Sequence, residues 1–299
     1  MSEWKIYNNG NYKVGIDLAS GTKIRETEDD VFISAFPENI DIKITNQCDM
    51  GCPMCHENSY PEGQHGNIMK AKFINTLRPY TELAIGGGNA LAHPDLIPFL
   101  EKLRSRDIIP NLTVNQVHFM QNKELLKSLV ERRLIFGLGV SFCEATKEFL
   151  EAIKQFDNAV IHVINGIVTY GQMEFLADND LKVLILGYKD FRRGESYKKL
   201  RGGYIECNQI NLEAYLKDFI PRFKALSFDN LAIEQLNVKS LMTQEQWDEF
   251  YMGDDGQFTM YIDMVTETFA KNSVAALNKR YRLLDNIDDM FAKIKGESV

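Results

Sequence analysis

Short apolar runs alternate with amphipathic stretches through the middle of the chain. The runs occupy residues 40–45, 83–86, 112–115, 134–141, 159–164 and 182–186. Between them, apolar residues recur three and four positions apart, as at Leu96, Leu100 and Leu103, which is the spacing of one helix face. Strands that alternate with crossover helices predict a parallel sheet. We therefore expect residues 40–190 to form about six βα units of an α/β fold, as an open barrel or a doubly wound sheet.

The two ends of the chain follow other patterns. Residues 4–7 and 12–18 predict a β-hairpin, because the Asn-Gly pair between them supplies the positive φ that a tight turn requires. The last third is irregular, with a charged segment at 189–201, helical patterns at 212–223 and 283–294, and a turn at 253–256 that leads into a strand. We expect one compact domain with three parts: an N-terminal extended or hairpin segment (1–39), the barrel core (40–190) and an α+β C-terminal extension (191–299) that caps the barrel and shapes the substrate site.

Composition and charge exclude several classes of protein. A chain of 299 residues with 44% hydrophobic and 25% charged residues is neither disordered nor fibrous. Its 34 basic and 42 acidic residues give a net charge of −8, which disfavours binding to bulk nucleic acid. The sequence contains neither a signal peptide nor an apolar run long enough to span a membrane, so we expect a cytoplasmic protein that does not bind membranes.

Three cysteines within eight residues form the most specific motif. Cys48, Cys52 and Cys55 have the spacing C-x3-C-x2-C directly after the first predicted parallel strand. Thiolates in such a loop favour zinc or an iron–sulfur cluster. A closed zinc site would need a fourth ligand, whereas a [4Fe–4S] cube could keep one iron open. We expect the other two thiols, Cys143 and Cys207, to be buried and inert.

The cysteine motif, followed by a glycine-rich turn after the second strand, resembles the radical S-adenosylmethionine (radical SAM) enzymes. The resemblance covers residues 38–190 and departs mildly at Met54, where many members have an aromatic residue. It implies a partial TIM-like barrel, a [4Fe–4S] cluster held by the three cysteines, and S-adenosylmethionine as cosubstrate. Only Cys207 follows the barrel region, so an auxiliary-cluster (SPASM-type) domain is not expected.

The same resemblance implies a set of residues that contact S-adenosylmethionine. Asn89 stands where the family has a glutamate, so it would bind the methionine ammonium without a charge. The other implied contacts lie in the glycine turn and at the ends of later strands: Gly87, Gly88, Asn115, Ser141, Asn165, Gly187 and Tyr188.

The substrate is less well defined than the cofactors. Lys189, Arg192 and Arg193 belong to a basic run that could hold a phosphate or carboxylate, or could be a solvated loop. The resemblance implies reductive cleavage of S-adenosylmethionine to a 5′-deoxyadenosyl radical, with an electron donor such as flavodoxin or ferredoxin. We expect the radical to abstract hydrogen from an anionic small molecule or nucleoside. The alternatives are a peptide substrate and a non-catalytic zinc or other metal-binding protein.

Overall fold

All six strands predicted for the central region are present in the computed structural model, which describes residues 2–296. They are β4 (Asn39–Thr45), β5 (Glu82–Gly87), β6 (Ile109–Asn115), β7 (Gly137–Ser141), β8 (Ala159–Ile164) and β9 (Lys182–Leu186). Each pairs in parallel with the next, so their order in space is their order in sequence. A doubly wound sheet would reverse this order at a switch point. The fold is therefore α/β with the strand order of a barrel.

Four more strands lengthen this sheet to ten. β10 (Ala225–Phe228) pairs in parallel with β9, and β11 (Thr259–Asp263) pairs in parallel with β4. β12 (Thr268–Ala270) and β13 (Tyr281–Arg282) continue antiparallel beyond β11. Because β10 and β13 are the two edges of the sheet, the barrel is open. The turn into a strand expected near residue 258 is confirmed as β11, although its pairing with β4 was not predicted.

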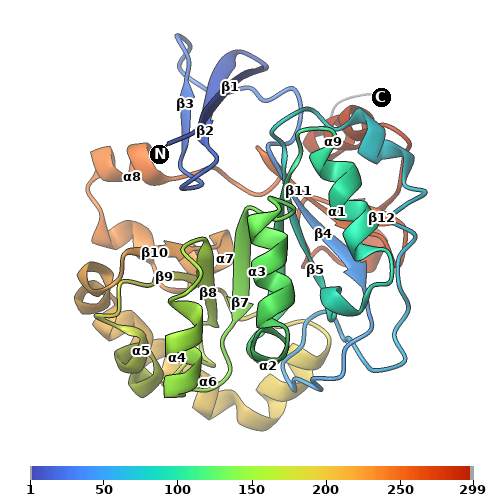
Figure 1. Ribbon diagram of the computed structural model, residues 1–299. Coiled ribbons are helices and arrows are strands. Elements are labelled where there is room, and N and C mark those ends of the chain that lie inside the picture. The colour runs from blue at the N-terminus through green and yellow to red at the C-terminus, as the bar shows by residue number, and fades with distance from the viewer. Residues whose placement is uncertain (1, 297–299) are drawn as a thin grey trace.

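Helices alternate with the strands of the barrel core as predicted, and several of them lie over the sheet (Figure 1). They are α1 (Leu96–Arg104), α2 (Gln116–Gln121), α3 (Lys123–Glu131), α4 (Lys147–Ile153), α5 (Tyr170–Leu176), α6 (Arg193–Phe219), α7 (Asn230–Gln235), α8 (Gln244–Phe250) and α9 (Ile287–Lys295). Short 3-10 helices are η1 (Lys72–Thr76), η2 (Ala90–Ala92), η3 (Ile220–Arg222), η4 (Val238–Leu241) and η5 (Leu277–Lys279). In the described part of the chain, no helix has the length and apolar character needed to cross a membrane.

Two sequence expectations for the last third need correction. The helix expected at 212–223 begins at Arg193 and ends at Phe219, so the first part of the charged segment is a loop and the rest is helical. A non-helical residue, Arg201, kinks this long helix just before two glycines. The final helix begins at Ile287, because the Asn286 side chain accepts a hydrogen bond from the Asp288 amide and caps it there.

The two faces of the sheet have different environments, as β4 illustrates. Ile40, Ile42 and Ile44 are at most 2% exposed and belong to the main hydrophobic core with the helices. Burying each of these side chains contributes roughly 1.5–3 kcal/mol, as an upper bound. Asp41 and Lys43, which alternate with them, face the inside of the barrel.

The inner face carries small and polar residues where a closed TIM barrel would be filled by branched aliphatic side chains. Thr113 on β6 and His162 on β8 are partly accessible, as is Gly86 on β5. Gly139 on β7 leaves room for the His162 ring, since a Cβ there would lie 2.5 Å from His162 Cε1. These inward-facing positions are therefore partly accessible and are not filled by a closed apolar core.

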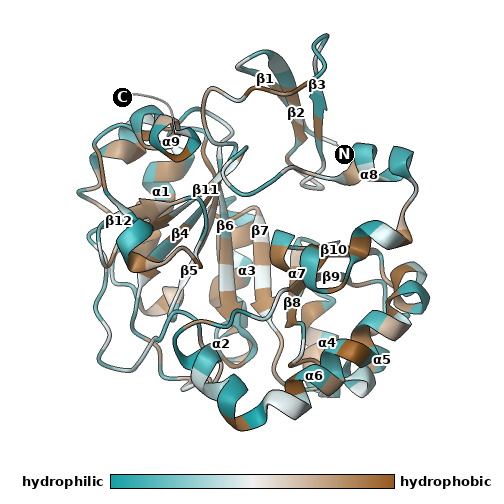
Figure 2. Ribbon diagram, turned by 180° about the vertical axis from the view of Figure 1, so that it is seen from behind, coloured by the Kyte–Doolittle hydropathy of each residue, from teal (hydrophilic) through white to brown (hydrophobic). Residues whose placement is uncertain are grey.

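A separate antiparallel sheet is formed by β1 (Trp4–Asn9), β2 (Tyr12–Asp17) and β3 (Lys23–Glu26). The predicted hairpin is confirmed as β1 and β2, whereas β3 was not predicted. This sheet lies at one end of the molecule, and α2 and α6 lie at the other (Figures 1 and 2). Since α2 directly follows β6, the carboxyl ends of the barrel strands are at the far end from the N-terminal sheet.

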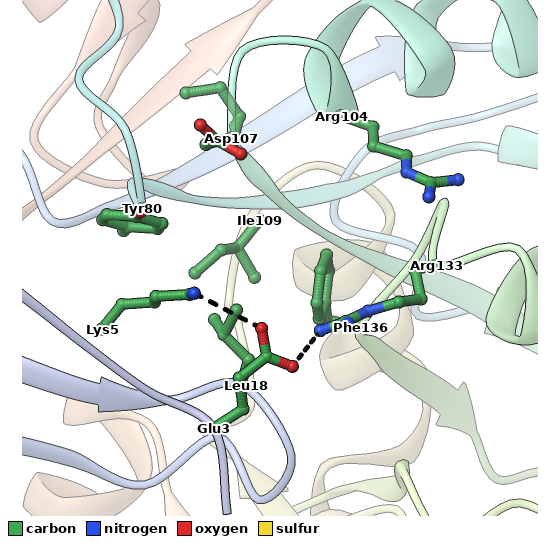
Figure 3. A pocket seen from close by; sticks show the side chains of 10 residues that line it. Glu3, Lys5, Leu18, Tyr80, Arg104, Asp107, Ile109, Arg133 and Phe136 are labelled. Carbon is green, nitrogen blue, oxygen red and sulfur yellow. Dashed lines mark hydrogen bonds and ion pairs between the residues drawn. The ribbon is translucent and has the colours of Figure 1, made fainter.

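A cavity of about 220 Å³ lies where the N-terminal segment meets the amino ends of β6 and β7 (Figure 3). Glu3 forms ion pairs there with Lys5 at 3.5 Å and Arg133 at 2.6 Å. All three charges are partly exposed, so these pairs contribute little stability. None of the predicted site residues lines this cavity.

Candidate functional site

The three clustered cysteines lie in a segment without regular secondary structure that follows β4, residues 46–66, here called the cysteine loop. It starts at the carboxyl end of β4, where parallel α/β folds place their sites. Cys48, Cys52 and Cys55 are all free thiols of intermediate exposure. Isolated bridges from Thr45 to His65 and from Gln47 to Tyr60 fold the loop back on itself.

The beginning of the loop is attached to α2. His118 is 3% exposed, and its Nε2 lies 2.7 Å from Oδ1 of Asp49, the residue after Cys48. The imidazole of His118 holds the pKa of Asp49 below its usual range, mainly through this hydrogen bond. In the structure His118 therefore supports the cysteine loop.

The glycine turn after β5 packs directly against the loop. A Cβ on Gly88 would lie 2.2 Å from the carbonyl oxygen of Gln47. Gly87 has a φ of +117°, and a Cβ there would lie 2.5 Å from the carbonyl oxygen of Thr45. The Asn89 amide donates to Gln47 O at 2.7 Å. These glycines are therefore required by the close approach of two backbone segments, independently of any ligand.

The Asn89 side chain also has a structural partner. Its Oδ1 accepts a hydrogen bond from the Leu91 amide at 3.2 Å and caps η2. An amide oxygen has two lone pairs, so a second donor such as an ammonium group remains compatible with this arrangement. Its contact with S-adenosylmethionine stays a prediction.

The basic residues predicted for substrate binding contact the loop just after Cys55. Arg192 Nη1 donates to Glu57 O at 2.9 Å, and Arg193 donates to Ser59 O. Lys189 Nζ lies 3.4 Å from His56 Nε2 and 3.0 Å from Ser273 Oγ. These side chains are therefore partly exposed but already have partners within the protein, and their role as substrate ligands stays a prediction.

A buried network of charges lies beneath this part of the loop. Glu57 Oε2 is 2.8 Å from Lys43 Nζ on β4, and Glu57 Oε1 accepts from the Tyr261 hydroxyl on β11 at 3.1 Å. Lys43 also lies 3.7 Å from Asp263, which is fully buried and 3.5 Å from Arg280. Buried charges persist only when paired in this way, so the network fixes the loop to two strands.

The local electrostatics disfavour thiolates in the metal-free chain. Burial raises the pKa of Cys48 and raises that of Cys52 to about 11, and neighbouring thiols add to both effects. Thiols with raised pKa values stay protonated at neutral pH and release protons only when a metal binds. Uptake of a metal is therefore expected to weaken as the pH falls.

The donor set fits an iron–sulfur cluster in its chemistry. Three reduced thiols lie on one loop, and Cys48, Cys52 and Cys55 are close enough for their charges to influence one another's ionisation. Thiolate is the usual protein ligand of such clusters. Within residues 2–296, no group of three or more His, Cys, Asp or Glu side chains is arranged to hold a single metal ion.

The strand ends predicted to contact the nucleoside lie at the same end of the barrel. Asn115 Oδ1 caps α2 through the Val117 amide, and its Nδ2 donates to Cys143 Sγ at 3.1 Å. The Ser141 side chain is partly exposed, and no hydrogen bond to its hydroxyl is formed within the described residues. Ser141 is thus the predicted contact whose side chain is most available to a ligand.

The remaining predicted contacts are tied to α7. Gln235 accepts hydrogen bonds from the Tyr188 amide at 2.8 Å and from Asn165 Nδ2 at 3.1 Å. The Gly187 amide donates to Asp229 Oδ1 at 2.8 Å. Asn165 is fully buried and its Oδ1 has no partner in residues 2–296. Side-chain contacts from Asn165 and Tyr188 to a ligand remain a prediction, since both are already packed.

The expectation that Cys143 and Cys207 are buried is wrong, because both are exposed. Cys207 lies on the part of α6 that follows its kink. Cys143 follows β7, and its charge raises the pKa of Cys52 more than those of Cys48 and Cys55 do. The structure therefore brings a fourth thiol near the cysteine loop. This proximity could not be predicted, because Cys143 lies about ninety residues from the loop in the sequence.

Asp41 is the most exposed charged side chain on the inner face of β4. Desolvation by the surrounding protein atoms raises its pKa to about 6, with Lys189 opposing the shift and Asp255 adding to it. It forms no hydrogen bond or ion pair with other residues in 2–296. The sequence showed Asp41 only as the polar member of an alternating strand.

Comparison with solved structures finds the same fold in Streptococcus suis SuiB. SuiB bound to precursor peptide SuiA matches with a TM-score of 0.64 and 13% identity over 99% of this chain and 90% of that chain. SuiB bound to S-adenosylmethionine matches with a TM-score of 0.64 and 12% identity over 96% and 87% of the two chains. A further SuiB structure has a TM-score of 0.55. Neither a protein-family model nor a curated protein sequence matches this chain.

Proposed function

We propose that this chain is a radical SAM enzyme. The observation that carries the proposal is the position of Cys48, Cys52 and Cys55, on a loop at the carboxyl end of β4 in an open parallel barrel. The similarity in fold to SuiB, which has been solved with S-adenosylmethionine, supports the resemblance found in the sequence. Bound to the three thiols, a [4Fe–4S] cluster would supply the electron that cleaves S-adenosylmethionine to a 5′-deoxyadenosyl radical.

The residues of the chain would bind and orient the reactants and keep water away from the radical. His118, the glycine turn and the network around Glu57 would hold the cysteine loop in place. Ser141 and Asn89 would bind polar groups of S-adenosylmethionine. The electron would come from a small donor protein such as flavodoxin or ferredoxin.

The substrate would bind at the inner face of the open barrel and lose a hydrogen atom to the radical. The basic run favours an anionic small molecule, but Lys189, Arg192 and Arg193 already contact the cysteine loop or Ser273. A peptide is the second candidate. It is favoured by the match of nearly the whole chain to SuiB solved with precursor peptide SuiA.

Anaerobic reconstitution with ferrous iron and sulfide tests the proposal. We expect a brown protein with about four iron and four sulfide per chain. Cys48→Ala, Cys52→Ala and Cys55→Ala should each lose the cluster, whereas Cys207→Ala, a matched control on α6, should keep it. One equivalent of zinc and no iron would favour the non-catalytic metal-binding alternative instead.

A further inference from the structure

The segment between β9 and α6 reaches across the molecule to the chain just beyond Cys55. The Arg192 side chain is 21% exposed, and its Nη1 lies 2.9 Å from the Glu57 carbonyl oxygen and 3.5 Å from the Glu57 carboxylate. Glu57 is two residues after Cys55. One guanidinium therefore holds both the backbone and the side chain next to the third cysteine.

The residue that Arg192 holds is itself rigidly placed. The Glu57 side chain is 8% exposed, pairs with Lys43 at 2.8 Å and accepts from the Tyr261 hydroxyl at 3.1 Å. These partners belong to β4 and β11, which are adjacent strands of the sheet. Arg192 thus connects the start of α6 to a point already anchored in the barrel.

The backbone of Arg192 is strained. Its φ of +53° and ψ of −120° belong to a region that glycine adopts readily and other residues rarely do. The turn is also tight on its far side, where the Tyr188 hydroxyl donates to Gly194 O at 2.6 Å. Such a conformation persists only when surrounding contacts hold it. The Arg192 guanidinium lies over the Phe191 ring, and its polar contacts are with the cysteine loop.

We propose that Arg192 is a positioning residue for Cys55. Its guanidinium fixes the chain after the cysteine, so that the thiol is held in place before any metal binds. The importance of this position for a cluster rests on the proposed function, but the restraint itself belongs to the metal-free chain. The substrate contact predicted for Arg192 stays a separate prediction.

Two substitutions at Arg192 separate the side chain from the backbone strain. Arg192→Ala removes the guanidinium and keeps the strain, whereas Arg192→Gly removes both. Substitution of Glu57 is less suitable, because it would leave Lys43 buried without its closest partner and threaten folding. Arg192 is partly exposed, so both variants are expected to fold.

The test is the rate at which iodoacetamide alkylates Cys55 in the metal-free, reduced full chain, followed by peptide mass spectrometry. Cys207 in the same chain is the reference thiol. We expect Cys55 to react about tenfold faster in both variants, because each loses one charge-assisted hydrogen bond. The rate of Cys207 should be unchanged. Neither variant alters the Cys55 thiol itself, so a faster reaction reports greater mobility of the chain around it.

Two results would overturn the proposal. An unchanged rate for Cys55 in both variants would show that the loop is held without Arg192. A faster rate in Arg192→Ala that returns to the wild-type value in Arg192→Gly would show that backbone strain, not the guanidinium, controls the loop. Iron content of the wild-type protein is measured separately, so failure of the proposed function would be recognised independently of these rates.

Discussion

His118 Nε2 and Asp49 Oδ1 lie 2.7 Å apart and join the first turn of α2 to the start of the cysteine loop. The imidazole is buried and the carboxylate is largely exposed, so the interaction is made at the surface of the core. A hydrogen bond to a charged group contributes about 1.5–3 kcal/mol when well formed and partly buried. It is one of the contacts that give an otherwise irregular loop a fixed position.

We predict that removing this contact loosens residues 48–55. Amide hydrogen exchange of this segment in the metal-free protein should be about tenfold faster in Asp49→Ala, which removes the contact from its exposed side without disturbing the core. His118→Ala should give the same increase together with a loss of stability from packing. Unchanged exchange in Asp49→Ala would show that the hydrogen bond between His118 and Asp49 does not restrain the loop.

Asn89 has both a structural and a predicted ligand-binding role, and two variants separate them. Asn89→Ala removes the cap of η2, which costs about 1 kcal/mol of unfolding free energy, and should weaken S-adenosylmethionine binding by about ten- to hundredfold. Asn89→Asp keeps the capping oxygen and adds a negative charge, so it should bind the ammonium more tightly. The measurements are urea unfolding of the metal-free protein and the Kd of the cluster-loaded protein. Equal Kd values for S-adenosylmethionine in the wild type and both variants would show that Asn89 only caps η2.

Gly139 and His162 should show strong coupling in a double-mutant cycle. A Cβ at position 139 would lie 2.5 Å from His162 Cε1 and 2.8 Å from Thr113 Oγ1, so Gly139→Ala should cost about 1–3 kcal/mol. The cost should shrink when His162 is also alanine. Gly171→Ala is the matched control, because open space surrounds that position in α5, and it should be neutral or stabilising. Additive effects of Gly139→Ala and His162→Ala would mean that the two residues do not meet.

His162 also predicts a pH dependence of stability. Burial lowers its pKa to about 4 from a usual value of 6.5. Between these values the unfolded chain binds a proton that the folded chain does not, so its contribution is complete above pH 6.5 and declines as the pH falls towards 4. Unfolding free energies measured across this range should fall less steeply in His162→Gln than in the wild type. If the unfolding free energies of the wild type and His162→Gln changed with pH in the same way, His162 would have the same pKa in the folded and unfolded chains.

Local sequence patterns predicted the parallel strands because these are consecutive and each has a strong apolar face, but the patterns left an open barrel and a doubly wound sheet both possible. The family resemblance implied the barrel. The six strands from β4 to β9 could be predicted because short apolar runs alternate with stretches of helical periodicity along the chain. Such patterns could not predict that Thr259–Asp263 pairs with β4, because that contact joins segments more than two hundred residues apart. Short strands such as β3 and β13 also lack the length that makes a pattern distinct.

The cysteine ligands could be predicted from spacing, but their supports could not. Glu57 and His118 are single polar residues in the sequence, and only tertiary contacts reveal that each holds the loop. The basic run showed where charge is available without showing what it contacts. In the structure Arg192 donates a hydrogen bond to the protein's own backbone. The sequence alone does not distinguish an arginine with such a partner from one that is free to bind an anion.

Formation of 5′-deoxyadenosine tests the proposed activity most directly. The reconstituted protein is incubated anaerobically with S-adenosylmethionine and dithionite, and the products are separated by chromatography, with Cys52→Ala treated in parallel. We predict slow formation of 5′-deoxyadenosine and methionine by the wild type, even without substrate, and none by the variant. Intact S-adenosylmethionine after long incubation with a fully reduced, four-iron protein would contradict the assignment as a radical SAM enzyme.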